Sequence, residues 1–169
     1  MPRNTKGYTL IELMVVIILL GLVFAITAPR FRDAVLTDNL KSTTRKLIGK
    51  INELRTDAIQ KQEIHFLFFD LESNMYWHGP EGMTPEGRDL YRKERATYLP
   101  QGIRITDISF KDRDKKIGGE ISLRFNKKGY VQQSAIHLEA EDGREFTIVL
   151  RTFLPGVKIF EKYIEFEDL

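Results

Sequence analysis

A long apolar run near the N-terminus constrains this 169-residue chain more than any other feature. The run extends from Tyr8 to Ala28, is followed by Pro29, and contains one charged residue, Glu12. A helix of that length rises about 31 Å, close to the hydrocarbon thickness of a bilayer. A carboxylate inside a membrane span costs roughly 2.5–3.5 kcal/mol on insertion scales. We therefore expect Glu12 to have a partner and a purpose beyond anchoring.

The overall composition excludes several classes of function. The chain has 26 basic and 24 acidic residues, and its mean hydropathy is −0.28, so the body is polar and its net charge favours no class of partner. It has no cysteine, which excludes disulfides, thiolate metal sites and cysteine nucleophiles. The GxSxG, HExxH, phosphate-loop and dinucleotide-binding motifs are also missing from the sequence. We expect no catalytic residues and no cofactor.

The N-terminal segment has three open interpretations. A secretory signal peptide explains Arg3 and Lys6, but the apolar run is longer than a usual signal core, and Ala25–Pro29 is a poor cleavage site. An uncleaved signal anchor would hold the N-terminus in the cytoplasm. Cleavage before the apolar run, at Gly7, would instead keep the span in the mature protein.

Residues 8 to 61 have the pattern of one long helix. Pro29 lacks an amide donor and crowds the preceding turn, so we expect a kink or local melting near Gly21–Pro29. Beyond the proline, apolar residues recur every three or four positions, which predicts an amphipathic continuation over residues 29–63. These residues are Phe31, Val35, Leu40, Leu47, Ile48, Ile51, Leu54, Ala58 and Ile59.

From residue 64 the apolar period changes to two, which predicts a mostly antiparallel β domain over residues 64–169. The expected strands are Ile64–Phe69, Met75–Trp77, Ile103–Phe110, Ile121–Phe125, Ile136–Leu138, Phe146–Leu150 and Val157–Ile159. A short helix at Glu86–Glu94, a charged turn at Lys111–Lys116 and a turn at Asn126–Gly129 complete the pattern. The predicted fold class is α+β, with the long N-terminal helix packed on the β domain.

The remaining polar residues predict no binding site. His65, His78 and His137 are scattered without a second ligand at metal-binding spacing, and the acidic stretches match no calcium-binding loop, so no metal site is expected. Acidic residues dilute the basic positions of Lys41–Arg55, which argues against nucleic acid as a partner. Trp77 and the phenylalanines at 66, 68 and 69 are expected in the core.

Residues Gly7-Tyr8-Thr9-Leu10-Ile11-Glu12-Leu13 resemble the type IV prepilin signal, in which a short basic leader ends in glycine and the fifth mature residue is glutamate. Tyr8 stands where the family usually has phenylalanine, and Pro29 stands where pilin helices commonly carry proline. The resemblance implies a leader over residues 1–7 and a membrane and polymerisation helix over residues 8–28. It also implies cleavage between Gly7 and Tyr8 by prepilin peptidase, followed by N-methylation of Tyr8.

The β region is similar to the H-type minor pseudopilins of type II secretion systems and to the related minor type IV pilins. The similarity rests on the strand order, on Arg124–Gly129, on a hairpin around Asp142-Gly143 and on Pro155-Gly156-Val157. It implies a pilin-like fold on a single-pass protein of the bacterial inner membrane, with a cytoplasmic N-terminus and a periplasmic domain.

As such a subunit, the chain would join other major and minor pseudopilins in a periplasmic filament, with an inner-membrane assembly platform as a further partner. There we expect Glu12 of one subunit to pair with the new α-amino group of Tyr8 in its neighbour. Two alternatives stay open: a minor type IV pilin for pilus assembly, adhesion or DNA uptake, and, from another class, a single-pass anchored periplasmic enzyme or sensor.

Overall fold

A computed structural model describes residues 9–111, 113–152 and 156–168, without the side chains of residues 26–38, 113, 114 and 167. The chain divides into two compact units, Met1–Val35 and Leu36–Leu169. Helix α1 (Leu10–Lys61) contributes to both. The kink predicted at Pro29 lies outside the residues whose side chains are described, and it stays a prediction.

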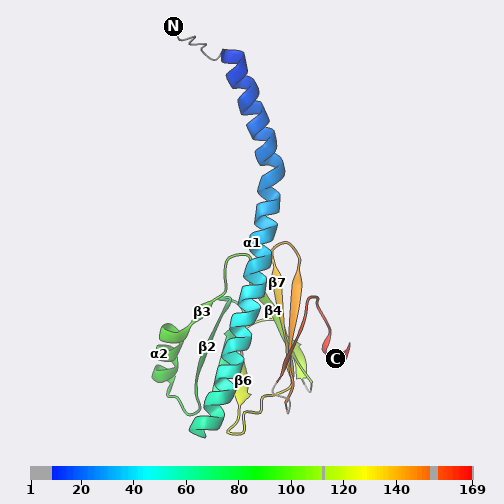
Figure 1. The fold of residues 1–169 in the computed structure, drawn as a ribbon. Coiled ribbons are helices and arrows are strands. Elements are labelled where there is room, and N and C mark those ends of the chain that lie inside the picture. The colour runs from blue at the N-terminus through cyan, green and yellow to red at the C-terminus, as the bar shows by residue number, and fades with distance from the viewer. Residues whose placement is uncertain (1–8, 112, 153–155, 169) are drawn as a thin grey trace. The chain divides into compact units, whose positions relative to one another are not determined.

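Two antiparallel sheets make up most of the second unit (Figure 1). The four-stranded sheet has the order β3-β2-β1-β6, and the five-stranded sheet has the order β5-β4-β7-β8-β9. The strands are β1 (His65–Asp70), β2 (Met75–Pro80), β3 (Thr97–Tyr98), β4 (Ile103–Phe110), β5 (Arg113–Lys116), β6 (Glu120–Phe125), β7 (Ser134–Ala140), β8 (Glu145–Leu150) and β9 (Val157–Phe160). Helix α2 (Pro85–Arg95) connects β2 to β3, and the 3-10 turn η1 (Phe166–Asp168) follows β9.

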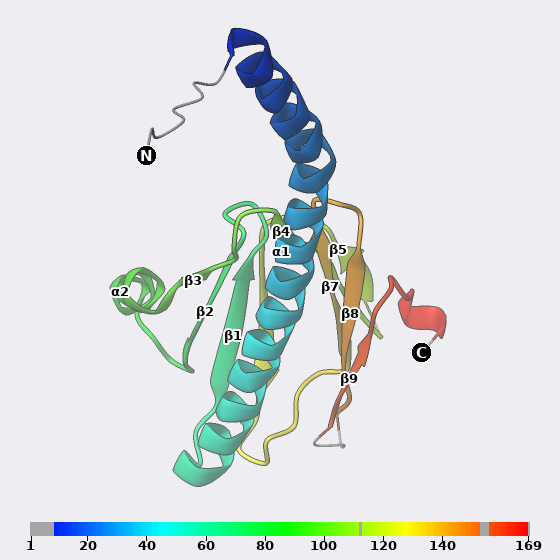
Figure 2. The same cartoon turned by 45° about the horizontal axis from the view of Figure 1, so that its top comes forward.

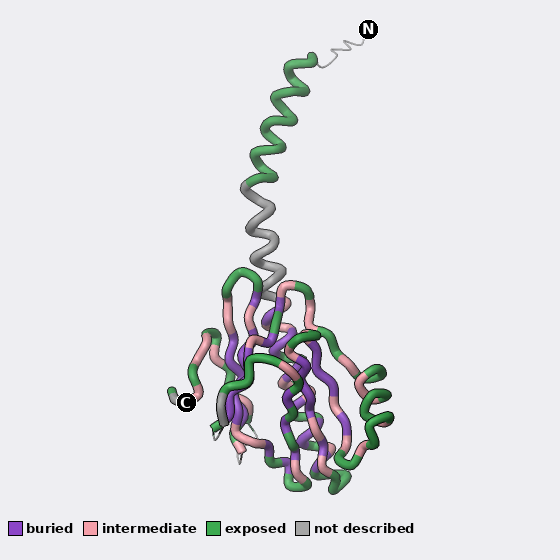
Figure 3. The backbone as a smooth tube through the Cα atoms, turned by 180° about the vertical axis from the view of Figure 1, so that it is seen from behind, coloured by how far each residue is buried: buried purple, intermediate pink, exposed green. Residues whose placement is uncertain are grey.

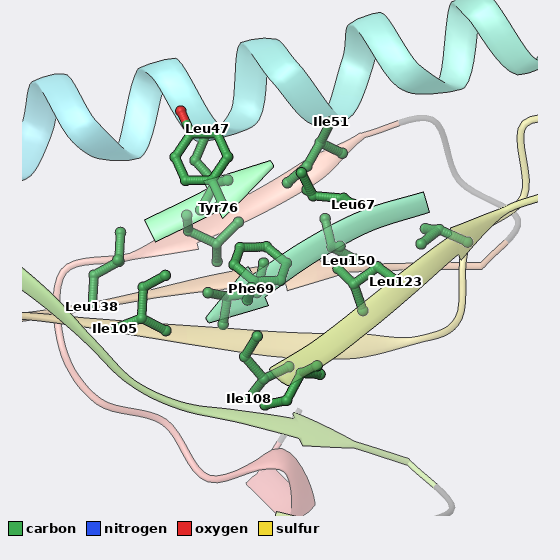
Figure 4. Close-up of a cluster of buried hydrophobic side chains, with 14 of the residues drawn as sticks. Leu47, Ile51, Leu67, Phe69, Tyr76, Ile105, Ile108, Leu123, Leu138 and Leu150 are labelled. Atoms are coloured by element: carbon green, nitrogen blue, oxygen red, sulfur yellow. The ribbon is translucent and has the colours of Figure 1, made fainter. Parts of the chain in front are cut away.

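The second half of α1 packs on both sheets (Figures 1 and 2). Its buried side chains recur every three or four residues, as an amphipathic helix requires. They are Leu40, Leu47, Ile51, Leu54 and Ala58, each at most 1% exposed. In Figure 4, Leu47 and Ile51 point from the helix toward side chains of both sheets, including Tyr76, Leu67 and Leu138. The predicted α+β fold, with the helix packed on an antiparallel β domain, is confirmed.

Most predicted strands form where the apolar alternation places them. In β6, Ile121, Leu123 and Phe125 are buried while the residues between them are exposed. The predicted turn that follows also forms, because the Asn126 side chain accepts hydrogen bonds from the amides of Lys128 (2.9 Å) and Tyr130 (3.0 Å). Short apolar alternation was therefore a sound guide to the sheet elements.

The charged turn predicted at Lys111–Lys116 is wrong. Residues Arg113–Lys116 form the edge strand β5, which pairs with β4 at Phe110↔Arg113 and Ile108↔Lys116. Charged side chains are common on edge strands because they discourage pairing with other chains. Here the hydrogen bonds offered by β4 determine the strand, and local composition does not.

Asn74 connects the two sheets. It lies in the β1–β2 turn with φ +50°, a left-handed conformation that asparagine tolerates better than most residues. Its side-chain nitrogen donates to the carbonyl of Ile103 (2.6 Å), and its side-chain oxygen accepts from the amide of Ile105 (3.2 Å). The side-chain amide of Asn74 therefore bonds to the backbone of β4 as a neighbouring strand would. These two bonds hold the hairpin against the five-stranded sheet.

The outer face of the β1–β2 hairpin carries an aromatic stack beneath α2. Trp77 is fully buried, and its ring stacks on Phe68 with centroids 4.0 Å apart. The Arg88 guanidinium of α2 lies 5.0 Å from the Phe68 ring centre, and Arg92 forms an ion pair with Asp70. The expectation that Trp77 and its aromatic neighbours belong to the core is confirmed for Trp77, Phe68 and Phe69, while Phe66 is half-buried.

His78 lies at the seam between the hairpin, α1 and the end of α2. Its Nε2 is 3.4 Å from Nη1 of Arg95, and Lys50 of α1 adds a second cation nearby. Burial, together with these two cations, lowers the pKa of His78 to about 4. The folded domain therefore holds this imidazole in its neutral form at pH values where a free histidine is already charged.

We expect acid to destabilise the domain through His78. The unfolded chain takes up a proton here near the ordinary histidine pKa of about 6.5, whereas folded His78 does so only near pH 4. Between these values the unfolded state binds more protons, so the free energy of unfolding falls as the pH falls. Because the side chain is only partly buried, the loss should be about 1–2 kcal/mol.

His78→Gln should remove that part of the pH dependence. The measurement is urea unfolding of the full chain in mild detergent between about pH 4 and 7, followed by the fluorescence of Trp77, which is the only tryptophan. Parallel loss of stability in wild type and variant on acidification would show that His78 is not responsible.

Candidate assembly site at the start of the long helix

The candidate site is the beginning of α1, in the first compact unit. Thr9 precedes the helix, and its carbonyl accepts the first helical bond, from the Leu13 amide at 3.2 Å. Thr9 Oγ1 accepts from the Glu12 amide at 3.3 Å, and Glu12 Oε2 accepts from the Thr9 amide at 3.5 Å. This reciprocal pair is a capping box, which satisfies two amides that the helix leaves without internal partners.

The capping box gives Glu12 a local partner that the interpretation of the sequence missed. Its signal was present in Thr9-Leu10-Ile11-Glu12, which has the capping-box spacing. The bond uses Oε2, and a carboxylate offers about four acceptor positions. Glu12 can therefore cap its own helix and accept a further donor from elsewhere.

From Leu10 to Phe24, every residue of α1 except Glu12 and Gly21 is a large apolar one, so apolar side chains face all sides of the helix. This stretch of the helix is exposed (Figure 3). The apolar side chains have exposed fractions from 46% at Val16 to 81% at Leu10. They are Leu10, Ile11, Leu13, Met14, Val15, Val16, Ile17, Ile18, Leu19, Leu20, Leu22, Val23 and Phe24. A helix that is apolar all round needs lipid or other protein to cover it.

Two predicted site residues, Gly7 and Tyr8, lie outside the described residues, so the cleavage and methylation positions stay predictions. Glu12 lies in the first turn of α1, and its pairing with the Tyr8 amine stays a prediction. Within the described part of the chain, no helix combines the length and apolarity needed to cross a membrane.

The three histidines do not form one group, and His137 has a partner that no sequence spacing indicated. His65 and His78 lie on the β1–β2 hairpin, whereas His137 lies on β7. The β4–β7 register places His137 opposite Asp107, with Nδ1 and Oδ1 2.7 Å apart. Across the described ranges, no group of three or more histidine, aspartate and glutamate side chains could hold a metal ion.

The Asp107–His137 pair is a structural contact. The other ring nitrogen of His137 lies 2.9 Å from the carbonyl oxygen of Ile164, where a catalytic pair would present a nucleophile. Both side chains are almost fully buried, at 3% and 1% exposed. This arrangement can hold a segment of chain in place, and it offers no position for a reacting group.

Comparison with known families supports the N-terminal assignment. The family described as "Prokaryotic N-terminal methylation motif" matches residues 2–28, which include Gly7, Tyr8 and Glu12. No curated protein matches the sequence.

Solved structures decide the fold. The minor pseudopilin EpsH from the type 2 secretion system of Vibrio cholerae superposes with a TM-score of 0.53 and 10% sequence identity, over 73% of this chain and 98% of the EpsH chain. The chain has a pseudopilin fold. A second structure of EpsH from the same secretion system gives a TM-score of 0.52 at 11% identity, over 76% and 97% of the two chains. The pseudopilin fold thus extends well beyond the N-terminal motif.

Proposed function

We propose that this protein is a non-catalytic minor pseudopilin of a type II secretion system, which is processed by prepilin peptidase and assembled into a periplasmic filament that helps to export folded proteins. The observation that carries the proposal is the match of residues 2–28 to the N-terminal methylation motif, in a chain whose folded domain has the pseudopilin fold. An anchored enzyme or sensor would leave the methylation motif without a use.

The exposed apolar part of α1 supports two successive locations for the subunit, first the membrane and then the filament. In the membrane, lipid covers the side chains from Leu10 to Phe24; in a filament, the same side chains of neighbouring subunits cover one another. Little apolar surface is exposed to water in either state. Other pseudopilins and the inner-membrane assembly platform are therefore the partners that we propose for this helix.

Glu12 supplies the specific contact in this proposal. Cleavage after Gly7 leaves a positively charged amine on Tyr8, next to the N-terminus of α1. The helix dipole places positive potential there, so the amine is poorly accommodated by its own helix. A carboxylate from a neighbouring subunit would offset that repulsion. Its attraction to the amine would in turn offset the cost of removing the carboxylate from water. The capping bond to Thr9 holds Glu12 in the first turn without occupying all of its acceptor positions.

Glu12→Gln separates the two roles of this residue. Glutamine keeps an oxygen that can accept from the Thr9 amide, so it preserves the capping box, but it removes the charge. We expect Glu12→Gln and Glu12→Leu to lower incorporation into filaments equally, by at least about tenfold, because each loses a charge-assisted contact of about 1.5–3 kcal/mol. Incorporation is measured as the fraction of subunit that copurifies with the filament from a secretion-competent strain that lacks the native subunit.

Thr9→Val is the matched control, because it removes the capping hydroxyl and leaves the Glu12 charge. It should assemble nearly normally, and all three variants should still fractionate with the membrane. Normal assembly of Glu12→Gln together with failure of Thr9→Val would assign Glu12 to helix capping alone and contradict the charge pairing.

Processing at Gly7 can be tested separately. The intact mass of the membrane-extracted protein should correspond to loss of residues 1–7 and gain of one methyl group. Gly7→Leu should retain the leader, because a larger side chain at the cleaved bond blocks the peptidase. A full-length wild-type protein in a strain with active prepilin peptidase would contradict the proposal.

Recovery of secretion, as opposed to piliation, by the wild-type gene distinguishes a pseudopilin from a minor type IV pilin.

A further inference from the structure

The central strands of the five-stranded sheet, β4, β7 and β8, are largely buried on both faces. One face belongs to the core shared with α1, and the other carries polar residues that are nevertheless buried, among them Asp107, Ser109, His137 and Thr147. The cover over this second face includes the C-terminal segment, residues 161–168, which follows β9 and includes η1. Figure 2 shows the segment beside β8 and β9, at the C-terminal end of the chain.

Two side chains of the sheet hold the backbone of this segment. Thr147 Oγ1 donates to the carbonyl of Lys162 (2.7 Å) and accepts from the amide of Ile164 (3.1 Å). His137 Nε2 lies 2.9 Å from the carbonyl oxygen of Ile164, and the ring of Tyr163 stacks on the imidazole with centroids 4.1 Å apart. The contacts are made mainly to main-chain atoms over three consecutive residues.

The imidazole of His137 faces an acceptor at each nitrogen. Nδ1 lies 2.7 Å from Oδ1 of Asp107, and Nε2 lies 2.9 Å from the Ile164 carbonyl, which can only accept. A neutral imidazole has one N–H and one lone pair, so it can satisfy only one of these partners when Asp107 is ionised. Both contacts are satisfied together when both nitrogens carry protons.

Two carboxylates and one ammonium lie at or next to the contacts of His137. Burial alone would raise the pKa of Asp107, but the hydrogen bond and charge of His137, with Lys115 and Ser109, outweigh it and lower the pKa. The Lys115 ammonium of β5 lies 3.6 Å from Asp107 and 3.7 Å from Glu165 of the segment. With His137 charged, two cations balance two carboxylates; with His137 neutral, one negative charge is left in excess.

Tyr163 and three hydroxyl side chains complete the contacts around the ring and Asp107, and they carry no charge. The Tyr163 hydroxyl accepts a hydrogen bond from Lys115, and burial raises the pKa of this phenol, so it stays neutral. β8 presents Thr147, and β4 also presents Thr106 and Ser109, which donate to Asp107 at 3.3 Å each. The groups that titrate or carry charge in these contacts are Asp107, Lys115, Tyr163 and Glu165. On the same strand as His137, Glu139 is ion-paired with Arg104 of β4.

We propose that His137 is a protonation-dependent clasp, which holds the C-terminal segment on the five-stranded sheet as an imidazolium and releases it when the imidazolium loses a proton. The proton that remains stays on Nδ1, toward the stronger acceptor, the Asp107 carboxylate. The lone pair of Nε2 then faces the lone pairs of the Ile164 carbonyl, and the contact becomes repulsive. Closing takes up one proton, so the opening constant rises with pH, by at most about tenfold per pH unit.

The protonation state is tested directly by long-range ¹H–¹⁵N correlation spectra of the histidine rings in the full chain, in detergent micelles. Loss of signals in His65→Gln and His78→Gln assigns the other two rings. At a pH where the segment is docked, both His137 nitrogens should be protonated. A His137 ring with one unprotonated nitrogen while the segment remains docked would overturn the proposal.

Release is tested by hydrogen exchange of residues 161–168, expressed as protection factors so that the intrinsic pH dependence of exchange is removed. In the wild type, protection should fall as the pH rises. Asp107→Asn removes the carboxylate that favours the charged ring, so protection should be lost at lower pH. Thr147→Val, the matched control, should lower protection by a similar factor at every pH, because its bonds to Lys162 and Ile164 do not titrate.

A wild-type protection factor that does not change with pH would also overturn the proposal. If Asp107→Asn fails to fold, the wild-type spectra and the wild-type pH series still decide the question. None of these measurements depends on filament assembly, so their outcome is independent of the proposed secretion function.

Discussion

The contact between the buried stripe of α1 and the two sheets supports the whole folded domain. Leu40, Leu47, Ile51, Leu54 and Ala58 meet core side chains from both sheets, so one helix face closes a core that the two sheets share. Burial of each large aliphatic side chain contributes about 1.5–3 kcal/mol. Asn74 adds a polar link between the sheets.

The same helix has a second kind of surface in the first unit. There the apolar side chains are exposed on all sides, and the turn that precedes them is closed by Thr9 and Glu12. The apolar side chains in the second half of α1 are thus buried within their own chain, whereas those in the first half need lipid or other subunits to cover them. Such a division is what a subunit needs if its domain must fold before its stem is covered by neighbours, and it agrees with the pseudopilin fold and the methylation motif.

The periodicity of apolar residues predicts the elements whose buried face is set by neighbouring positions in the sequence. The alternation of Ile121, Leu123 and Phe125 fixed the inner face of β6, and the three-and-four spacing along α1 fixed its buried stripe. The capping box at Thr9 and Glu12 also has a local signature, the spacing of Thr9-Leu10-Ile11-Glu12. In contrast, β5 is a charged segment that becomes a strand only because β4 offers it hydrogen bonds. The Asp107–His137 contact joins residues far apart in sequence, and only the β4–β7 register brings them together.

We propose above all that Glu12 of one subunit pairs with the Tyr8 amine of the next. The most direct measurement is the structure of the assembled filament by electron cryo-microscopy, at a resolution that shows side chains. We expect a Glu12 carboxylate oxygen about 2.7–3.2 Å from the α-amino nitrogen of Tyr8 in a neighbouring subunit. A filament in which Glu12 contacts only Thr9 of its own helix, while that amine binds a different group, would contradict it.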